Sequence, residues 1–344
     1  MIAFRHYLAC SAWIPLAILF TSPATAGGWR EASITVDGIE RWYRVYLPDA
    51  LPRKSPLLLS LHGGGGDMHT IDNGPTHGWV RQANKHKFLM VVPNASNKSG
   101  DTRGNRQNWN DLRSSADSQS DADDVGFINA LLDRVEADYE TSASSVYVTG
   151  VSNGGLMTYR LLIEAPSRFA AAAVFVANIP VDPTRLRPSA HPVPLLIWSG
   201  SDDRLMKYEG GEIPGKRGMM RSTPDNVAWW VMANRADGAE IQSEMLPDIS
   251  NDGCRVRRTF YPALSNGAPV LFYLAEGGGH QMPSQTEKDS EGGPFFRMLV
   301  GRVCRDVDGA DIAWEFMRHF KSREVASTKW RSSGTPAGKP AGAP

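Results

Sequence analysis

The feature that most constrains the fold is a series of short apolar runs, separated by segments with helical spacing. Most of these runs are nearly continuous in apolar residues, which is typical of strands buried on both faces of a parallel sheet. They lie at 42–47, 57–61, 88–92, 146–149, 172–176, 195–199 and 270–275. The first run contains Arg44, so we expect it to be an edge strand or an antiparallel strand.

Segments with the pattern of helices alternate with these predicted strands, at 125–139, 155–164, 226–233 and 311–320. In the first of them the apolar residues share one helix face, and aspartates stand at the N-terminal end, where the helix dipole favours negative charge. Strands that alternate with helices predict an α/β fold, in which a mostly parallel sheet is flanked by helices. The roughly 300 residues between the two ends of the chain are enough for one large α/β domain, so we expect a single domain, and no internal repeat is found.

Both ends of the chain differ in composition from this domain. Residues 1–26 combine a basic residue, a short apolar run and a small-residue site at Ala24-Thr25-Ala26, which predicts a secretory signal peptide cleaved after Ala26. Residues 327–344 are rich in Ser, Gly, Pro, Ala and Lys, and we expect a disordered tail there. The folded domain is therefore predicted at 27–326, in a secreted or periplasmic protein.

Charge and cysteine content narrow the range of partners. Basic and acidic residues balance at 37 each, and neither a basic stripe nor a basic amphipathic helix is present. We therefore expect neither nucleic acid nor, after signal cleavage, a membrane as partner. Cys254 and Cys304 form either a disulfide or two buried thiols, because spacing alone does not establish proximity. No metal-ligand pattern is found, and the acidic stretch 117–124 lacks oxygen ligands where a calcium loop needs them, so no metal or cofactor is expected.

The run Gly150-Val151-Ser152-Asn153-Gly154-Gly155 stands between a predicted strand and a predicted helix. A serine on such a sharp turn has an exposed hydroxyl and lies beside the positive end of the helix dipole. Gly-x-Ser-x-Gly also occurs at ordinary glycine-bounded turns, but the flanking strand and helix favour a nucleophile. We therefore interpret Ser152 as the nucleophile of a serine hydrolase.

A nucleophilic serine needs a histidine as base and an acid that holds this histidine. In α/β-hydrolases the acid follows the serine in the chain, and the histidine follows the acid. His280 lies after Ser152 and follows a predicted strand, in a glycine-rich turn, and is the candidate base; the alternative is an ordinary loop histidine. Asp202 and Asp203 follow the strand 195–199, and either one is a candidate acid. The residues alone do not separate them, because a shift of one position redirects the side chain.

The strand 57–61 ends in His62 and the glycines 63–66, a pattern typical of the loop that donates an N–H to the oxyanion in ester hydrolases. The residue after the nucleophile, Asn153, would supply the second N–H. A merely flexible turn is the alternative. A phosphate-binding loop is disfavoured, since neither Gly-Lys-Ser/Thr nor the Rossmann spacing follows.

Together these segments resemble the secreted esterase family that includes poly(3-hydroxybutyrate) depolymerase-type proteins, feruloyl esterases and acetylxylan esterases. The resemblance spans nearly all of 27–326 and includes Arg44-Val45-Tyr46-Leu47-Pro48, Val91-Val92-Pro93, Trp109-Asn110-Asp111, Asp123-Asp124-Val125-Gly126-Phe127-Ile128 and Tyr208-Glu209-Gly210-Gly211. It implies an α/β-hydrolase fold and ester hydrolysis through Ser152, His280 and Asp203, with Asp202 as the alternative acid. It also implies the N–H groups of Gly64 and Asn153 as oxyanion donors.

The resemblance implies hydroxyalkanoate, feruloyl or acetyl esters as substrates. The short tail favours small or oligomeric esters over solid polymer, for which family members typically carry a further binding domain. Candidate cleft residues are Gly63, Trp109 and Met282; Trp109 either stacks on a substrate ring or belongs to the core. Met282 replaces the family's tryptophan, and Ser199 replaces a histidine, so the pocket is expected to differ in shape. An acyltransferase, a peptidase and a non-catalytic binding protein on the same fold are the alternatives.

Overall fold

The computed structural model of the chain describes residues 27–113, 120–182, 184, 186–238, 240–286 and 298–322. The signal peptide predicted at 1–26 and the tail predicted at 327–344 lie outside these ranges. Among the helices in the described ranges, none has both the length and the apolar character needed to cross a bilayer.

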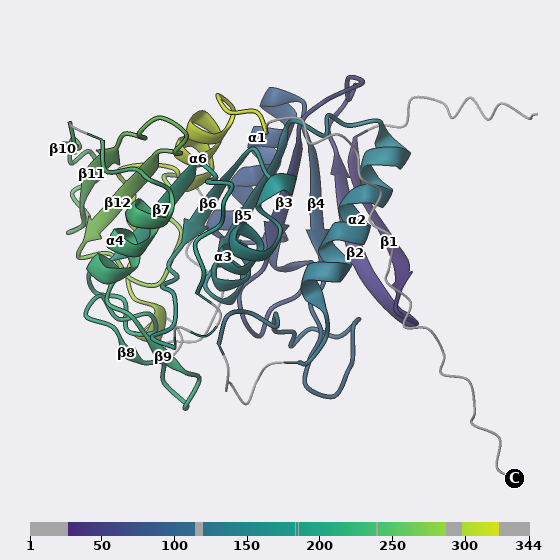
Figure 1. Cartoon of the computed structure of the whole chain (residues 1–344), viewed down its shortest axis with the longest axis horizontal. Coiled ribbons are helices and arrows are strands. Elements are labelled where there is room, and N and C mark those ends of the chain that lie inside the picture. Colours follow the sequence, from purple (N-terminus) through teal and green to yellow (C-terminus); the bar gives the residue numbers. More distant parts are fainter. Residues whose placement is uncertain are drawn as a thin grey trace, which may run out of the picture.

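A large mixed sheet forms the centre of the molecule (Figure 1). Within the described residues it contains ten strands, in the order β1-β2-β4-β3-β5-β6-β7-β12-β11-β10. Neighbours from β4 to β12 run parallel, whereas β1 and β2 on one side and β11 and β10 on the other pair antiparallel. The strand bounds are β1 Gly28–Val36, β2 Ile39–Leu47, β3 Leu57–Leu61, β4 Leu89–Pro93, β5 Val146–Val151, β6 Ala171–Phe175, β7 Leu195–Gly200, β10 Gln242–Met245, β11 Arg255–Tyr261 and β12 Val270–Glu276.

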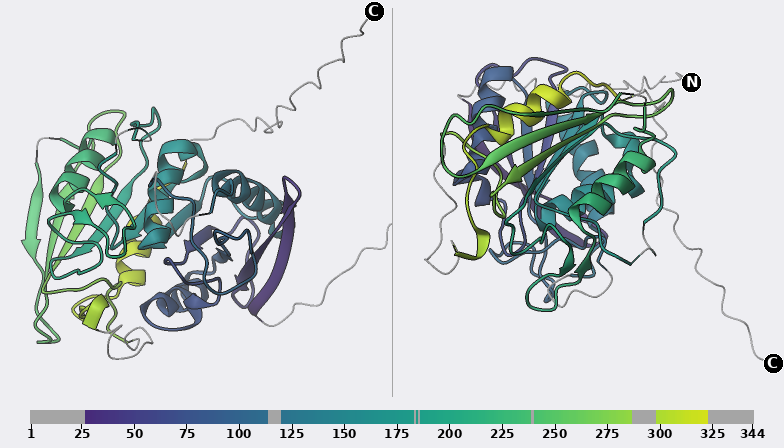
Figure 2. Two further views of the ribbon diagram at one scale, coloured as in Figure 1. Left: turned by 90° about the horizontal axis from the view of Figure 1, so that it is seen from below. Right: turned by 90° about the vertical axis from the view of Figure 1, so that its left-hand side faces the viewer.

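Helices cover both faces of the sheet (Figure 2). Helices α2, α3 and α4 pack in the hydrophobic core on one face, and α1 and α6 pack in the core on the other face. Their bounds are α1 Gly78–His86, α2 Asp124–Tyr139, α3 Asn153–Glu164, α4 Thr223–Ala233 and α6 Gly309–Met317, with 3-10 turns at Thr70–Asp72, Pro75–His77 and Pro166–Arg168. The predicted architecture, a mostly parallel sheet flanked by helices, is confirmed.

The two cores explain why the apolar runs are nearly continuous. In β3, Leu57 and Leu59 belong to the core under α2, α3 and α4, whereas Leu58 belongs to the core under α1 and α6. Successive side chains of a strand point to opposite faces, so a strand covered on both faces needs an apolar residue at every position. The run at 42–47 lies in β2, which is antiparallel to both of its neighbours, as one of the two expectations for it stated.

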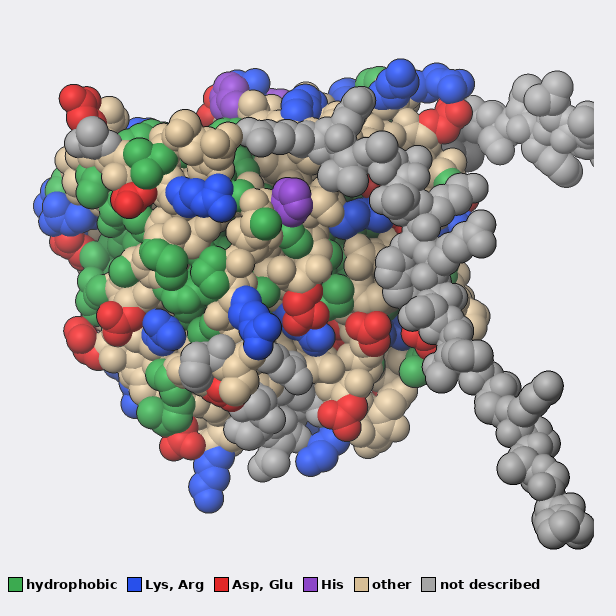
Figure 3. Space-filling model, in the orientation of Figure 1, with side chains coloured by type: hydrophobic (Ala, Val, Ile, Leu, Met, Phe, Trp, Pro, Cys, Tyr) green, Lys and Arg blue, Asp and Glu red, His purple; other side chains and the backbone are tan. Residues whose placement is uncertain are grey.

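A separate two-stranded hairpin, β8 Gly211–Glu212 and β9 Met219–Met220, follows β7 in the chain. The surface view in Figure 3 shows apolar side chains gathered on the face that carries α4, and charged side chains of both signs around them. Acidic and basic residues are equal in number in the chain, and on this face they are mixed and not separated into patches of one sign.

The carboxyl ends of the parallel strands meet at one edge of the sheet, where open α/β sheets bind their ligands. Candidate site residues, or the glycine loop, lie at or shortly beyond the ends of four of these strands. His62 follows β3, Ser152 follows β5, Asp203 lies just beyond β7, and His280 lies just beyond β12. The topology therefore brings segments from distant parts of the sequence to one place.

Candidate active site

Ser152 occupies a strained turn between β5 and α3. Its φ and ψ are 56° and −119°, so a residue with a side chain adopts a backbone conformation that usually favours glycine. The turn is held by two backbone hydrogen bonds, from Ser152 N–H to the carbonyl of Phe175 and from Leu156 N–H to the carbonyl of Ser152, both 2.9 Å long. Strain of this kind at an exposed strand-to-helix turn is typical of a nucleophilic serine.

Close packing around the turn depends on its glycines. A Cβ atom at Gly150 would collide with the carbonyl of Gly154, and a Cβ atom at Gly154 would collide with the backbone of Leu61 and His62. The small residues on each side of Ser152 therefore allow the turn to lie against the end of β3. This contact places the glycine loop that follows β3 beside the serine.

His280 is paired with a buried carboxylate. Its Nδ1 donates to Oδ2 of Asp203 at 2.7 Å, and both side chains are almost completely buried. The other oxygen of Asp203 accepts the N–H groups of Leu205 and Met206, at 2.8 and 2.7 Å. Since both carboxylate oxygens are occupied, the carboxylate is fixed in place and holds the imidazole with its Nε2 free to act as a base.

Asp202 has a different position. It is exposed, its carboxylate accepts the hydroxyl of Ser201 at 3.0 Å, and its backbone N–H donates to the carbonyl of Gly278. Of the two candidate acids, the one in contact with His280 is thus Asp203.

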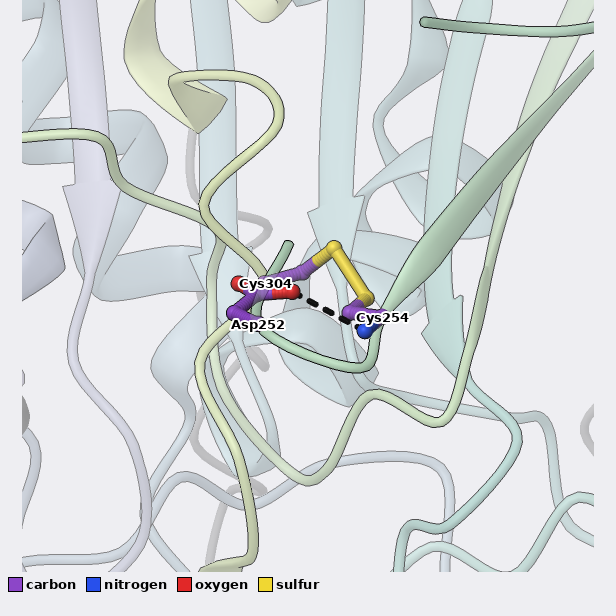
Figure 4. A group of neighbouring side chains, drawn as sticks. All are labelled: Asp252, Cys254 and Cys304. Carbon is purple, nitrogen blue, oxygen red and sulfur yellow. Dashed lines mark hydrogen bonds between the residues drawn. A yellow bond between two sulfur atoms is a disulfide. The ribbon is translucent and has the colours of Figure 1, made fainter. Parts of the chain in front are cut away.

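The loop that carries His280 is held by a neighbouring segment. The N–H groups of Gly279 and His280 donate to the carbonyls of Arg302 and Val300. The same segment ends at Cys304, which forms a disulfide with Cys254 at the start of β11 (Figure 4). The question of a disulfide or two thiols is therefore settled in favour of the disulfide, which ties the support of the His280 loop to the sheet.

Asp252 lies beside this disulfide, and its carboxylate oxygen comes within 4.8 Å of both sulfur atoms. The group does not resemble a metal site, because sulfur atoms in a disulfide are not thiolate ligands. The carboxylate instead accepts the backbone N–H groups of Cys254 and Arg305, each at 2.9 Å. Asp252 thus caps two backbone segments that the disulfide joins.

The glycine loop after β3 lies directly against the serine turn. A Cβ atom at Gly63 would be 3.8 Å from Cβ of Ser152, and one at Gly64 would be 3.2 Å from Cβ of Asn153. Asn153 is the first residue of α3, where a backbone N–H has no partner within the helix. The backbone of Gly63 and Gly64 therefore lies close to Ser152 and Asn153.

His62 supports this loop from below. Its Nδ1 donates to the carbonyl of Gly63 at 2.8 Å, and its Nε2 accepts the N–H of Ala95 at 3.2 Å. Burial disfavours the charged imidazolium and lowers the pKa of His62 to about 4. A neutral histidine with one donor and one acceptor nitrogen satisfies both contacts. No role for His62 itself is predicted from the sequence, although its position between β3 and the glycine run is a usable signal.

Trp109 lies under the loop and not in a binding surface. Its side chain is fully buried, and its indole N–H donates to the carbonyl of His62 at 3.0 Å. Of the two expectations for Trp109, the structure agrees with the core residue, and stacking on a substrate ring is wrong because the ring is not exposed.

The side chain of Asn153 is fixed by a buried polar cluster. Its amide oxygen accepts the N–H of Trp109 at 2.8 Å, and its amide nitrogen donates to Asp111 at 2.6 Å. Asp111 in turn forms an ion pair with Arg113, with a shortest distance of 2.7 Å, and both side chains are buried. This cluster orients the start of α3, which carries the N–H next to Ser152.

Ser152 and His280 line one cleft of about 520 Å³, which we call the serine cleft. Gly63, Gly64 and Met282 also lie in its wall, so the structure brings these sequence-derived candidates together. Met282 is 2 % exposed and packs against Gly309 at the start of α6. A cavity of this size accommodates a small organic molecule.

Comparisons with known proteins show which family the chain resembles. The chain matches the Esterase family, described as "Putative esterase", over residues 38–245. It is 28 % identical over 300 residues to "Putative esterase NocK" of Nocardia uniformis subsp. tsuyamanensis, covering 83 % of this chain and 81 % of that protein. It is 27 % identical over 219 residues to "Probable feruloyl esterase C" of Aspergillus clavatus, covering 61 % of this chain and 72 % of that protein.

Among solved structures, the acetyl xylan esterase from Aspergillus awamori aligns with a TM-score of 0.49 and 14 % sequence identity. The alignment covers 79 % of this chain and 99 % of that one. The match to the family spans more than half of the chain. The chain therefore belongs to the Esterase family and is a carboxylic ester hydrolase with an α/β-hydrolase fold.

Proposed function

We propose that the protein is a secreted serine esterase in which Ser152, His280 and Asp203 form a catalytic triad. The observation that supports this most directly is that the strained Ser152 lines the same cleft as His280, whose Nδ1 is paired with the buried Asp203. In the first half-reaction, Oγ of Ser152 bonds to the ester carbonyl carbon while Nε2 of His280 takes the hydroxyl proton. Asp203 stabilises the imidazolium, and the N–H groups of Gly64 and Asn153 donate to the oxyanion.

Collapse of the tetrahedral intermediate breaks the bond to the alcohol, which leaves with the proton held by His280. Water then attacks the acyl-enzyme, His280 again takes and returns the proton, and the carboxylic acid is released. This sequence of steps is supported by the presence of Ser152, His280, Gly64 and Asn153 in the wall of the serine cleft, with Asp203 hydrogen-bonded to His280.

The test of the triad is Ser152→Ala. We expect kcat for p-nitrophenyl butyrate to fall by about 10⁴-fold or more, because the covalent step is lost. A fluorophosphonate probe should label the wild-type protein and not the variant. Ser33→Ala, on the distant edge strand β1, serves as the matched control and should behave as the wild type. Undiminished hydrolysis by Ser152→Ala, or no labelling of the wild type, would refute the proposal.

For the substrate, we propose small or oligomeric esters of the hydroxyacyl, feruloyl or acetyl type. The volume of the serine cleft and its apolar wall residues Leu156, Leu205 and Met282 support an acyl group of limited size. A panel of p-nitrophenyl acyl esters, methyl ferulate and hydroxybutyrate oligomers tests this. A kcat/KM that is high only for long-chain acyl esters, with no hydrolysis of the acetyl, feruloyl and hydroxybutyrate esters, would contradict it.

For the location, we propose export with cleavage after Ala26. The composition of residues 1–26 and the disulfide between Cys254 and Cys304 both support an oxidising compartment outside the cytosol. N-terminal sequencing of the protein recovered from the medium or periplasm should begin at Gly27. Recovery of the full-length chain from the cytosol alone would contradict export.

A further inference from the structure

The wall of the serine cleft carries charge of one sign. Among its described lining residues, two have permanently charged side chains, Arg113 and Arg217, and no Asp, Glu or Lys is present. The chain as a whole has equal numbers of acidic and basic residues, so the cleft departs from the average of the molecule. A cleft lined by one sign of charge concentrates ligands of the opposite sign.

The two arginines differ in how far their charge is neutralised. Nε and one terminal nitrogen of Arg113 donate to the buried carboxylate of Asp111, at 2.7 to 3.0 Å. Its other terminal nitrogen donates to the backbone carbonyl of Arg217 at 2.8 Å. Arg113 is thus committed to internal partners, and it fixes the turn that carries Arg217.

Arg217 stands in the turn between β8 and β9, and its Nε donates to the carbonyl of Pro214 at 2.7 Å. No carboxylate of the described residues forms an ion pair with it, and its two terminal nitrogens have no acceptor there. Burial, followed by the nearby charge of Arg113, lowers the pKa of Arg217. A partly buried guanidinium that has no carboxylate partner is stabilised when an anion binds to it.

We propose that the serine cleft selects esters that carry a free carboxylate, and that Arg217 binds this carboxylate. The inference rests on the proposed esterase function and names a substrate class for the same site. The two free terminal nitrogens of a guanidinium match the two oxygens of a carboxylate in a bidentate pair. Because the turn is held by Arg113 and by the contact to Pro214, Arg217 is positioned before the ligand arrives.

The test compares two esters that both release p-nitrophenol. One is mono-p-nitrophenyl adipate, which has a free carboxylate, and the other is methyl p-nitrophenyl adipate, in which this carboxylate is a methyl ester. The quantity measured is the ratio of kcat/KM for the charged ester to kcat/KM for the uncharged one. In Arg217→Gln this ratio should fall by about tenfold or more. The control is Lys216→Gln, which removes the same charge from the preceding position of the same turn. The side chain of Lys216 is exposed and does not line the cleft. The ratio in this variant should stay at the wild-type value.

A second pair of esters locates the carboxylate. In the adipate monoester the carboxylate is on the acyl side, whereas in 3-acetoxybutyrate it is on the alcohol side; ethyl 3-acetoxybutyrate is the uncharged partner. A fall of the ratio in either pair supports the proposal and assigns the side. An unchanged ratio in both pairs, or an equal fall in Lys216→Gln, overturns it.

Binding separates this inference from the proposed function. Calorimetry with monomethyl adipate is carried out on Ser152→Ala and on Ser152→Ala combined with Arg217→Gln, neither of which needs to turn over. The second variant should bind about tenfold more weakly, and the difference should shrink at high salt. If wild type hydrolyses neither ester while this binding difference is found, the esterase proposal fails and the carboxylate site stands. Equal binding by the two variants overturns the carboxylate site.

Discussion

At the scale of single residues, the site is organised by hydrogen bonds that are complete before any substrate binds. Asp203 has both carboxylate oxygens occupied, by His280 on one side and by two backbone N–H groups on the other. Asn153 and His62 have their side-chain polar atoms satisfied in the same way. Pre-positioned groups of this kind lower the cost of reorganisation during the reaction.

A substitution of the acid should therefore act on geometry and tautomer. In Asp203→Asn the amide has no second acceptor oxygen, and it no longer holds the Nδ1–H tautomer of His280. We expect kcat to fall by about 10³- to 10⁴-fold with little change in KM. The neighbouring Asp202→Asn, at an exposed position, should stay within about twofold of wild type. Steady-state kinetics on p-nitrophenyl butyrate measure both, and a larger loss in Asp202→Asn than in Asp203→Asn would assign the acid to Asp202.

At the scale of elements, the proposed reacting groups stand on loops that are hydrogen-bonded to neighbouring segments. The loop after β12 is hydrogen-bonded to the segment that contains Val300 and Arg302, and this segment is joined by Cys304 to the start of β11. The loops after β7 and β12 are also linked to each other, since the N–H of Asp202 donates to the carbonyl of Gly278. The position of His280 thus depends on a covalent bond outside the cleft.

Removal of that bond should affect both stability and activity. In the double variant Cys254→Ser/Cys304→Ser we expect the free energy of unfolding to fall by about 2–4 kcal/mol, as for a closed loop of this length class. Activity should fall at temperatures well below the unfolding midpoint, because the support of the His280 loop loosens first. Urea unfolding and kinetics on the same samples measure the two effects.

A reductant provides the control for this experiment. Dithiothreitol should convert the wild type to the behaviour of the double variant and leave the double variant unchanged. An equal effect of dithiothreitol on both proteins would show that the reductant acts elsewhere than on the disulfide.

At the scale of the whole molecule, the buried neutral His62 links global stability to pH. Its pKa is about 4 in the folded chain and near 6.5 when exposed, so between these values the unfolded chain binds a proton that the folded chain does not. The contribution is fully present above pH 6.5 and is lost as the pH falls towards 4. The difference corresponds to about 3 kcal/mol.

Urea unfolding at pH 7 and at pH 4.5 measures this effect. The loss of stability on acidification should be larger in the wild type than in His62→Gln, which cannot be protonated there. If the variant does not fold, the imidazole resonances of His62 in the wild type provide the measurement, and they should show no titration above pH 5. Titration near pH 6.5 would contradict the neutral, buried state.

The sequence predicts best those elements whose side chains all lie in the same environment, such as the apolar interior. Strands such as β3 and β5 are buried on both faces, so their apolar runs predict a parallel sheet. Strand β11 was not predicted, because Arg255, Arg257 and Arg258 give it a polar composition while its pairing with β12 is a property of the sheet. Helix α1 has nine residues, too few for a clear helical pattern.

The candidate site likewise contains residues that a local sequence pattern identifies and residues that it does not. Ser152 and His280 are recognised because each stands at a strand end with glycines around it. Asp202 and Asp203 are adjacent, and what separates them is the direction of a side chain, which depends on the hydrogen bonds of the loop. The contacts of Trp109 and Arg217 involve partners far away in the sequence, so no local pattern reveals them.

The strand order predicts when activity appears during folding. Asp203 and His280 are separated by 77 positions, and they meet only after β12 has paired in parallel with β7. Contacts between distant segments form late, because the chain first loses the entropy of closing the intervening loop. We therefore expect refolding chains to regain most of their helical signal before they regain any reactivity towards a fluorophosphonate. The time at which the probe begins to label Ser152 would then report when β12 pairs with β7.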